Sequence, residues 1–293
     1  MVYLNALVGH QGKFGCRLYC PAPEQHKPNG PVYYSTLLRP IRYVMQECDH
    51  PDILHFMPLV SLSAQYFANL MFLLKSPNDT QYKKCQLRTS ITKVTIFLGL
   101  PSNHILNIPG CFRSDIMHLA SFNIGDLFLL LWRGVFDHDH EDPTLSWPWA
   151  VLTGQVWEAH GSTVAAVTPY LPSSFDCPPH NIAEKINSGY KAWEWLLYLY
   201  GLAPVLLYGV LPMVYYIHFC KLVWGMCIIQ QHRIRTSDLI VAQQMLLSFS
   251  HEFKLLYYQC RMDQIHLCQQ SIHALLHLAS KVIRIGPPIC SLQ

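Results

Sequence analysis

The chain has 293 residues, a length that suits one large domain or two ordinary ones. Its residues are 51% hydrophobic, 12% aromatic and only 13% charged, a composition that excludes a globally disordered chain and provides for a sizeable core. The formal charge of +3 is unevenly spread. Residues 1–100 contain ten Lys and Arg and five Asp and Glu, a net charge of +5. Residues 101–200 contain four and ten, a net of −6, and residues 201–293 contain seven and three, a net of +4. This layout permits a polyanionic partner.

Residues 1–60 are rich in Gly, Pro, Cys and His, and predict a small irregular module. CRLYC places Cys16 and Cys20 in a C-x3-C pair, and ECDH adds Cys48 and His50. Two thiols followed by a Cys/His pair make the ligand set of a structural zinc site, which would also stabilise a segment with little core. The alternative is a set of isolated buried cysteines.

The cysteines also indicate the compartment. Eleven are dispersed along the chain without a dense disulfide pattern, and the first residues, MVYLNALVGHQGK, lack the basic start and long apolar run of a signal peptide. We expect a reducing compartment, in which cysteines serve as small core residues or metal ligands.

The middle of the chain predicts helices separated by polar connectors. Apolar positions recur at helical spacing in residues 59–75, and residues 115–134 predict a mostly buried helix. A Pro-rich connector spans 168–181. A basic patch follows the first helix and is the candidate nucleic-acid contact: it comprises Lys83, Lys84, Arg88 and Lys93.

The stretch from Trp195 to Cys220 contains no residue of fixed charge and is long enough for a transmembrane helix. Gly201, Pro204, Gly209 and Pro212 divide it, however, and its tyrosines are not confined to two ends. We expect a buried, kinked helical hairpin, with a membrane span as the lesser alternative.

Two further helices are expected towards the C-terminus. Residues 237–261 form the clearest amphipathic pattern, with Thr236 or Ser237 as N-cap; the residues of its apolar face are Leu239, Ala242, Leu246, Phe249, Phe253, Leu256 and Cys260. Residues 263–284 predict the next helix. Its His266, His273 and His277 share one face, as metal ligands or as hydrogen-bonded side chains at a seam between helices.

Asp115 has two interpretations. As an N-cap it would accept backbone N–H bonds from a helix beginning at Ile116. As a catalytic acid it would need partner carboxylates around metal ions, and sequence spacing alone provides none.

The acidic loop DHDHED, 137–142, could bind a hard cation but equally suits a solvated loop. The chain contains no GxGxxG, P-loop or GxSxG motif.

Several longer blocks resemble a known family. They are GKFGCRLYCP, HKPNGPVYY, CDHPDI, SPNDTQYKK, RSDIMHLASFNIGDLFLLLWRG, AEKINSGYKAWE, LLYLYGLAPVLLYGVLP and IHALLHLASKVIRIGPPICS. Their order is similar to that in CACTA-like, including Plavaka-like, transposases of mushroom-type fungi, and the resemblance covers nearly the whole chain.

The resemblance implies a DDE-type transposase, whose RNase H-like domain holds two Mg²⁺ ions with carboxylates and cleaves and joins DNA. It implies that Asp115 is one of those acids, that Cys16 and Cys20 belong to a zinc site, that transposon-end DNA is the partner and that the protein is nuclear, or cytoplasmic if decayed. The expected fold is mainly α: a Cys/His module over 1–60, then a helical transposase-like region over 61–293.

Two departures from the family pattern concern activity. The family's first catalytic aspartate precedes a block like GKFGCRLYC, and its last catalytic glutamate follows a block like GPPICS; here fifteen residues precede Cys16 and the chain stops at Gln293. We therefore expect a fragment or remnant without activity as it stands. The alternatives are a non-catalytic nucleic-acid- or protein-binding remnant and a membrane protein.

Overall fold

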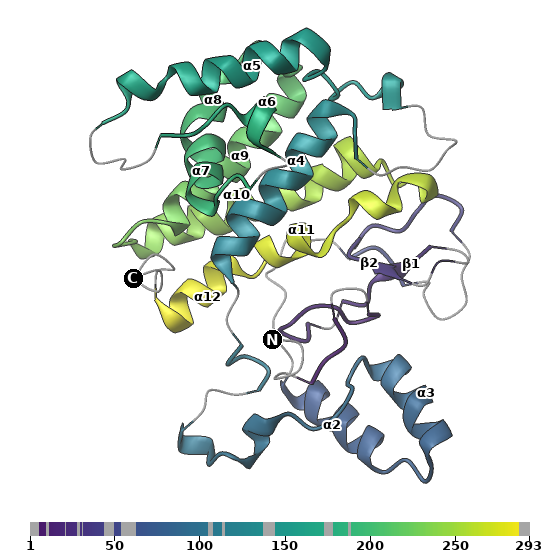
Figure 1. Ribbon diagram of the computed structural model, residues 1–293. Coiled ribbons are helices and arrows are strands. Elements are labelled where there is room, and N and C mark those ends of the chain that lie inside the picture. The colour runs from purple at the N-terminus through teal and green to yellow at the C-terminus, as the bar shows by residue number, and fades with distance from the viewer. Residues whose placement is uncertain are drawn as a thin grey trace. The chain divides into compact units, whose positions relative to one another are not determined.

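The computed structural model is mainly helical, with one two-stranded antiparallel sheet among the residues that it describes (Figure 1). Those residues are 6–9, 12–20, 22–27, 30, 32–43, 50–53, 63–104, 108–112, 115–136, 144–172, 178–186 and 189–286. The mainly helical class and the Cys/His-rich N-terminal segment agree with the sequence expectation.

The chain divides into two compact units. The first comprises Met1–Ser114 and Phe253–Lys281, and the second comprises Asp115–Glu252 and Val282–Gln293. Residues 61–114 and the segment Phe253–Lys281 thus belong to the same unit as the N-terminal segment.

The N-terminal part of the first unit is irregular. Strands β1 (Gln25–His26) and β2 (Tyr33–Tyr34) pair antiparallel, with Gln25 opposite Tyr34. The segment that follows is joined to the C-terminal part of the same unit by backbone hydrogen bonds from Ser35 N–H to the Cys268 carbonyl (2.9 Å) and from Ile41 N–H to the Cys260 carbonyl (2.8 Å). These bonds replace the regular secondary structure that a Gly- and Pro-rich sequence does not form.

Helices α2 (Ser63–Leu74) and α3 (Asp79–Thr89) pack on a shared core. Tyr66, Leu70 and Leu73 lie four and three residues apart, so they form one buried face of α2. Asn78 caps α3 by accepting the Gln81 N–H, and Ser90 ends it with a positive φ. Short 3₁₀ turns follow at Ile96–Gly99 and Ser102–His104.

The C-terminal part of the first unit is not the single helix expected over 263–284. A π-helical turn, Lys254–Tyr258, is followed by a 3₁₀ turn, Met262–Leu267, and then by α11 (Gln270–Leu275) and α12 (Leu278–Ile285). The first unit ends within α12, at Lys281. The chain ends its helical run at Gln259, which has a positive φ of 54°. It tightens again at Leu276 and His277, whose N–H groups bond three residues back rather than four.

The second unit begins with the expected helix after Asp115, formed as a π-helical turn, His118–Asn123, that continues into α4 (Ile124–Arg133). Gly134 ends α4 at a φ of 66°, which suits glycine. The 3₁₀ turn Thr144–Ser146, α5 (Gly154–Ala166), the 3₁₀ turn Thr168–Tyr170 and α6 (Ile182–Lys185) follow. Phe128 of α4 lies in the core, with its ring 5.1 Å from that of Trp132 and 5.8 Å from that of Phe249.

The uncharged stretch from Trp195 to Cys220 is broken, as its glycines and prolines predict. Contrary to the expectation, it is not buried throughout, because several of its apolar side chains are exposed: Val205, Tyr208, Met213, Val214 and Ile217. It contains the end of α7 (Ala192–Leu197), a π-helical turn at Tyr198–Leu202, α8 (Ala203–Leu206) and the start of α9 (Met213–Ile229). Among the described residues, no helix combines the length and the apolar character that crossing a membrane requires.

Helix α10 (Thr236–Phe253) has the predicted buried face, and its end at Phe253 is earlier than the predicted 261. It packs against α9: His218 stacks on Phe249 with ring centroids 4.3 Å apart. A Cβ added at Gly225 would lie 2.8 Å from Leu246, so glycine allows this close approach of the two helices.

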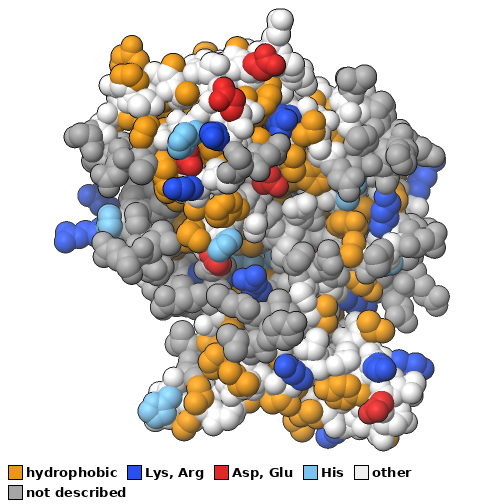
Figure 2. Space-filling model, viewed as in Figure 1, with side chains coloured by type: hydrophobic (Ala, Val, Ile, Leu, Met, Phe, Trp, Pro, Cys, Tyr) orange, Lys and Arg blue, Asp and Glu red, His pale blue; other side chains and the backbone are white. Residues whose placement is uncertain are grey.

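The two units have opposite net charge. The first contains fourteen Lys and Arg against six Asp and Glu, a net of +8, and the second contains seven against twelve, a net of −5. Figure 2 shows Lys and Arg side chains interspersed with hydrophobic ones over the α2–α3 region, in the lower part of the view. The basic character of the chain therefore belongs to its first unit.

Candidate metal centre

The C-x3-C pair lies in a tight turn of the first unit. The Tyr19 N–H bonds to the Cys16 carbonyl at 2.8 Å, and Tyr19 has a positive φ of 52°, so the chain reverses between the two cysteines. The Tyr19 hydroxyl donates to the Thr89 carbonyl at 2.7 Å and accepts from the Asn69 amide at 2.7 Å. These bonds fix the turn against α2 and α3, and both cysteines are buried.

His273 and His277 approach the cysteines from the C-terminal part of the same unit. His273 lies in α11, and His277 follows four residues later, so both rings leave the same face. Both are 2% exposed. The spacing is H-x3-H, which lies within the range of zinc-binding histidine pairs.

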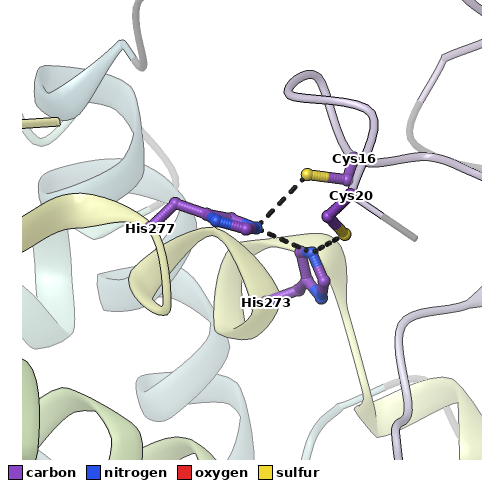
Figure 3. Close-up of side chains that lie close together, drawn as sticks. All are labelled: Cys16, Cys20, His273 and His277. Carbon is purple, nitrogen blue, oxygen red and sulfur yellow. Dashed lines mark hydrogen bonds between the residues drawn. The ribbon is translucent and has the colours of Figure 1, made fainter. Parts of the chain in front are cut away.

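Four ligand atoms converge at this site (Figure 3). Cys16 Sγ lies 3.4 Å from His277 Nε2, Cys20 Sγ lies 3.2 Å from His273 Nε2, and the two Nε2 atoms are 3.1 Å apart. All four atoms lie within 4.8 Å of one another. A tetrahedral zinc ion with Zn–S of about 2.3 Å and Zn–N of about 2.0 Å places its ligand atoms about 3.3–3.8 Å apart. The side chains are therefore close to the spacing that one such ion requires.

The protonation of the site also suits a metal. The Cys20 thiol donates a hydrogen bond that lowers the pKa of Cys16 well below its usual value, and the nearby His277 and His273 rings add to the effect. The same hydrogen bond raises the pKa of Cys20. Burial lowers the pKa of His273, which favours the neutral imidazole that binds metals. A cation between the sulfurs would replace the shared proton.

The outer nitrogens of the two rings are buried. Neither Nδ1 of His273 nor Nδ1 of His277 has a hydrogen-bond partner among the described residues, although both atoms are buried. A metal-bound histidine usually donates through this outer nitrogen, as a histidine at a helix seam does, so the Nδ1 atoms do not distinguish the two. The assignment rests on the two Nε2 atoms, which lie 3.4 Å and 3.2 Å from the sulfurs.

The second pair of ligands differs from the one that the sequence suggested. Cys48 lies outside the described residues. His50 is not in the four-residue group, and its Nδ1 atom lies 2.8 Å from the Pro51 carbonyl oxygen. His266, the first histidine of the C-terminal stripe, belongs to the 3₁₀ turn and also lies outside the group. The sequence thus singled out the cysteine pair and, separately, the two histidines that lie beside it, but it joined the cysteines to Cys48 and His50.

The candidate nucleic-acid residues lie on exposed surface of the first unit. Lys83, Lys84 and Arg88 lie on α3, and Lys93 follows it; all four are exposed. Between residues 61 and 114 the sequence has six Lys and Arg and one acid, Asp79. The guanidinium of Arg88 lies 5.4 Å from the centroid of the Phe72 ring on α2, which fixes its position beside an exposed aromatic.

Asp115 has the geometry of a helix cap. Its Oδ1 accepts the His118 N–H at 3.1 Å, and its Oδ2 lies 2.7 Å from His118 Nδ1. Among the described residues, the four-residue Cys/His group is the one set of His, Cys, Asp and Glu found close enough to share a metal ion, and it does not include Asp115. The acidic loop 137–142 lies outside the described residues.

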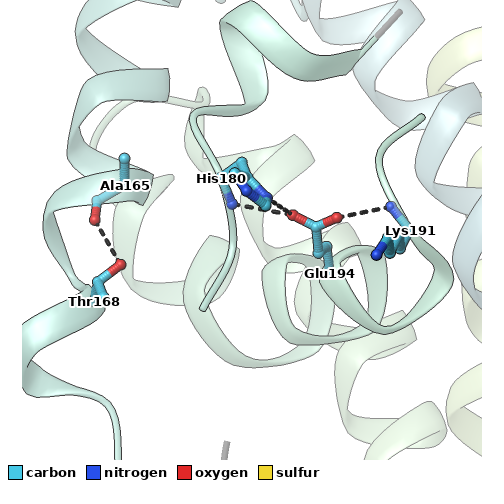
Figure 4. A network of polar contacts seen from close by, with 5 residues as sticks. All are labelled: Ala165, Thr168, His180, Lys191 and Glu194. Carbon is cyan, nitrogen blue, oxygen red and sulfur yellow. Dashed lines mark hydrogen bonds and ion pairs between the residues drawn. The ribbon is translucent and has the colours of Figure 1, made fainter. Parts of the chain in front are cut away.

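A buried carboxylate in the second unit is occupied by the fold itself. Glu194 is 2% exposed and accepts the N–H groups of Lys191 and His180 at 2.9 and 3.1 Å, with His180 Nδ1 at 2.6 Å (Figure 4). Burial alone would raise the pKa of Glu194, but these bonds hold it below its ordinary value. Glu194 therefore joins two chain segments and is not a free acid.

Comparison of the chain with models of protein families, with curated proteins and with solved structures finds no match in any of the three.

Proposed function

We propose that Cys16, Cys20, His273 and His277 bind one zinc ion whose role is structural. The observation that supports this most directly is the convergence of two sulfurs and two Nε2 atoms within 4.8 Å in a buried site. Four protein ligands complete a tetrahedron and leave no position for substrate, which is the arrangement of structural zinc sites. The ion would hold the N-terminal turn against α11.

Metal analysis of the purified chain tests this proposal. We expect about one zinc per chain, lost on Cys20→Ser and His273→Gln and retained on Cys111→Ser and His266→Gln, which alter a cysteine and a histidine outside the group. Cobalt substitution adds a second readout, because thiolate ligands in a tetrahedral site give intense absorption bands. Equal metal loss in the two control variants, or a chain that binds no zinc or cobalt, would refute the proposal.

We also propose that the zinc-stabilised unit binds DNA, in keeping with the resemblance to fungal DDE transposases. The supporting observation is its net charge of +8, with Lys83, Lys84 and Arg88 exposed on one helix. Such a surface attracts phosphates and releases counterions on binding. In this proposal the chain contributes a helical, DNA-binding region of a nuclear transposase-type protein, and Asp115 acts as a helix cap without cleaving DNA.

Salt-dependent binding separates this role from a protein-binding one. Replacing Lys83, Lys84 and Arg88 together by Gln should weaken DNA binding and reduce the slope of log K against log salt by roughly 2–3, since each phosphate contact contributes about 0.7–0.9. The matched control replaces Lys185, Lys191 and Arg233 of the second unit by Gln. Absence of DNA binding at low salt, or an equal effect of the control, would exclude the proposed role.

A further inference from the structure

The exposed side of the α2–α3 pair combines cations with apolar side chains. Phe72 is 47% exposed and Leu87 is 77% exposed, in a region where most surface side chains of a soluble helix would be polar. Lys75 lies one turn after Phe72, and Lys84 lies one turn before Arg88. Because Arg88 lies over Phe72, the two helices contribute to one surface. We call this surface the Phe72 patch; it comprises Phe72, Lys75, Lys84, Leu87 and Arg88.

The contact between Arg88 and Phe72 defines how this surface could bind a ligand. The guanidinium lies 5.4 Å from the ring centroid, so it covers part of the ring while almost half of the side chain remains open to solvent. A flat π-system could therefore stack on the ring, and the neighbouring cations could pair with negative groups attached to it.

We propose that the Phe72 patch binds single-stranded nucleic acid, with a base stacked on Phe72 and phosphates paired with Lys75, Lys84 and Arg88. This inference rests on the proposed DNA-binding role and specifies its ligand. Charge favours a polyanion over a second copy of the chain, since two such surfaces would repel each other. Duplex DNA would satisfy the cations, but it keeps its bases stacked and would leave Phe72 and Leu87 exposed. A single strand satisfies both kinds of side chain.

The test compares variants that remove the aromatic face but keep the charge. Fluorescence anisotropy measures the binding of residues 1–293 to a labelled oligo-dT strand, to a duplex of the same length and to oligo-U. Phe72→Leu should weaken oligo-dT binding about 5- to 150-fold, the range for loss of one base stack, with the salt slope unchanged. Met71→Leu, at the adjacent exposed position, should leave it unchanged. The oligo-U arm shows whether RNA is bound as well as DNA.

Each outcome has a defined meaning. Binding of single strands that is insensitive to Phe72→Leu, or a preference for duplex, overturns this inference while leaving the DNA-binding role in place. Poly-glutamate that competes as well as an oligonucleotide of equal charge would also overturn it, in favour of an acidic protein partner. Absence of binding to any nucleic acid overturns both, and leaves the zinc site untouched. Because Phe72 is exposed, circular dichroism and zinc content should match the wild type.

Discussion

Cys20 Sγ lies 3.2 Å from His273 Nε2, although 253 residues separate the two along the chain. A second contact of the same kind, between Cys16 and His277, spans 261 residues. Backbone hydrogen bonds from Ser35 to Cys268 and from Ile41 to Cys260 already join the same two parts of the chain. What the site adds is four buried polar side chains in contact, and such groups are costly to bury without a partner. A zinc ion would provide that partner, because its binding energy becomes folding energy.

Removing the metal should loosen both ends of the site together. We expect a chelator to increase amide hydrogen exchange in residues 12–20 and 270–277 to the same extent, because one ion holds both segments. The bonds from Ser35 to Cys268 and from Ile41 to Cys260 do not involve the ion and should keep residues 35–43 protected. Exchange in α9 and the first turns of α10, in the second unit, is the internal control. Faster exchange in only one of the two segments would contradict a shared ion.

Asp115 should behave as a cap. Asp115→Ala removes the acceptor for the His118 N–H and should lower the free energy of unfolding by roughly 0.5–2 kcal/mol. Asp115→Asn keeps that acceptor and should cost less than Asp115→Ala, because Asn is as good an N-cap as Asp. Urea denaturation of the three proteins measures the difference. Metal-dependent DNA cleavage that is lost in both variants would instead make Asp115 catalytic.

The sequence singles out both halves of the candidate metal site but does not pair them. Cys16 and Cys20 stand out because a turn of three intervening residues is short enough to be recognised by spacing. The partner pair lies more than 250 residues away, and spacing at that range contains no information about contact. Nearness in sequence favours Cys48 and His50 as partners of the cysteines, whereas the fold brings His273 and His277 to Cys16 and Cys20.

Helical periodicity predicts where the helices lie but not where the helical run over residues 263–284 is interrupted. The apolar faces of α2 and α10 follow directly from three- and four-residue spacing. The division of residues 263–284 has no proline or glycine to signal it, so a continuous helix was the natural expectation. The break at Leu276 occurs beside the ring pair of His273 and His277, where tertiary contacts replace local propensity.

Glu194 should stabilise the second unit in its charged form. Its pKa is lowered in the folded protein, so its contribution is present above its ordinary pKa and is lost as pH falls through the lowered value. Glu194→Gln replaces one of the two carboxylate oxygens, which face N–H groups, by an NH₂ donor. It should lower the free energy of unfolding by roughly 1–3 kcal/mol near neutral pH. Glu184→Gln, at an exposed position nearby, is the matched control and should change little. Equal urea midpoints for the two variants would contradict this role.

Two buried histidines should make the second unit sensitive to acid. His160 is 7% exposed and lies 2.8 Å from the Tyr198 hydroxyl, and His218 is fully buried with its Nε2 2.9 Å from the Phe249 carbonyl. Burial lowers the pKa of each to about 4. Because unfolding restores the ordinary value of about 6.5, the unfolded chain binds protons that the folded one does not, and stability falls as pH drops below 6.5.

The loss should be measurable as a difference between two proteins. Each histidine should lower the free energy of unfolding by about 2 kcal/mol between pH 7 and pH 5, because its pKa differs between the folded and unfolded chain. His160→Gln removes one titrating group and retains a hydrogen-bond partner for Tyr198. Between pH 7 and pH 5, the free energy of unfolding in urea should therefore fall by about 2 kcal/mol less in this variant than in the wild type. Acid release of metal from the first unit affects both proteins equally and cancels in this comparison. Parallel pH profiles for the two proteins would show that His160 is protonated in the folded state as readily as in the unfolded one.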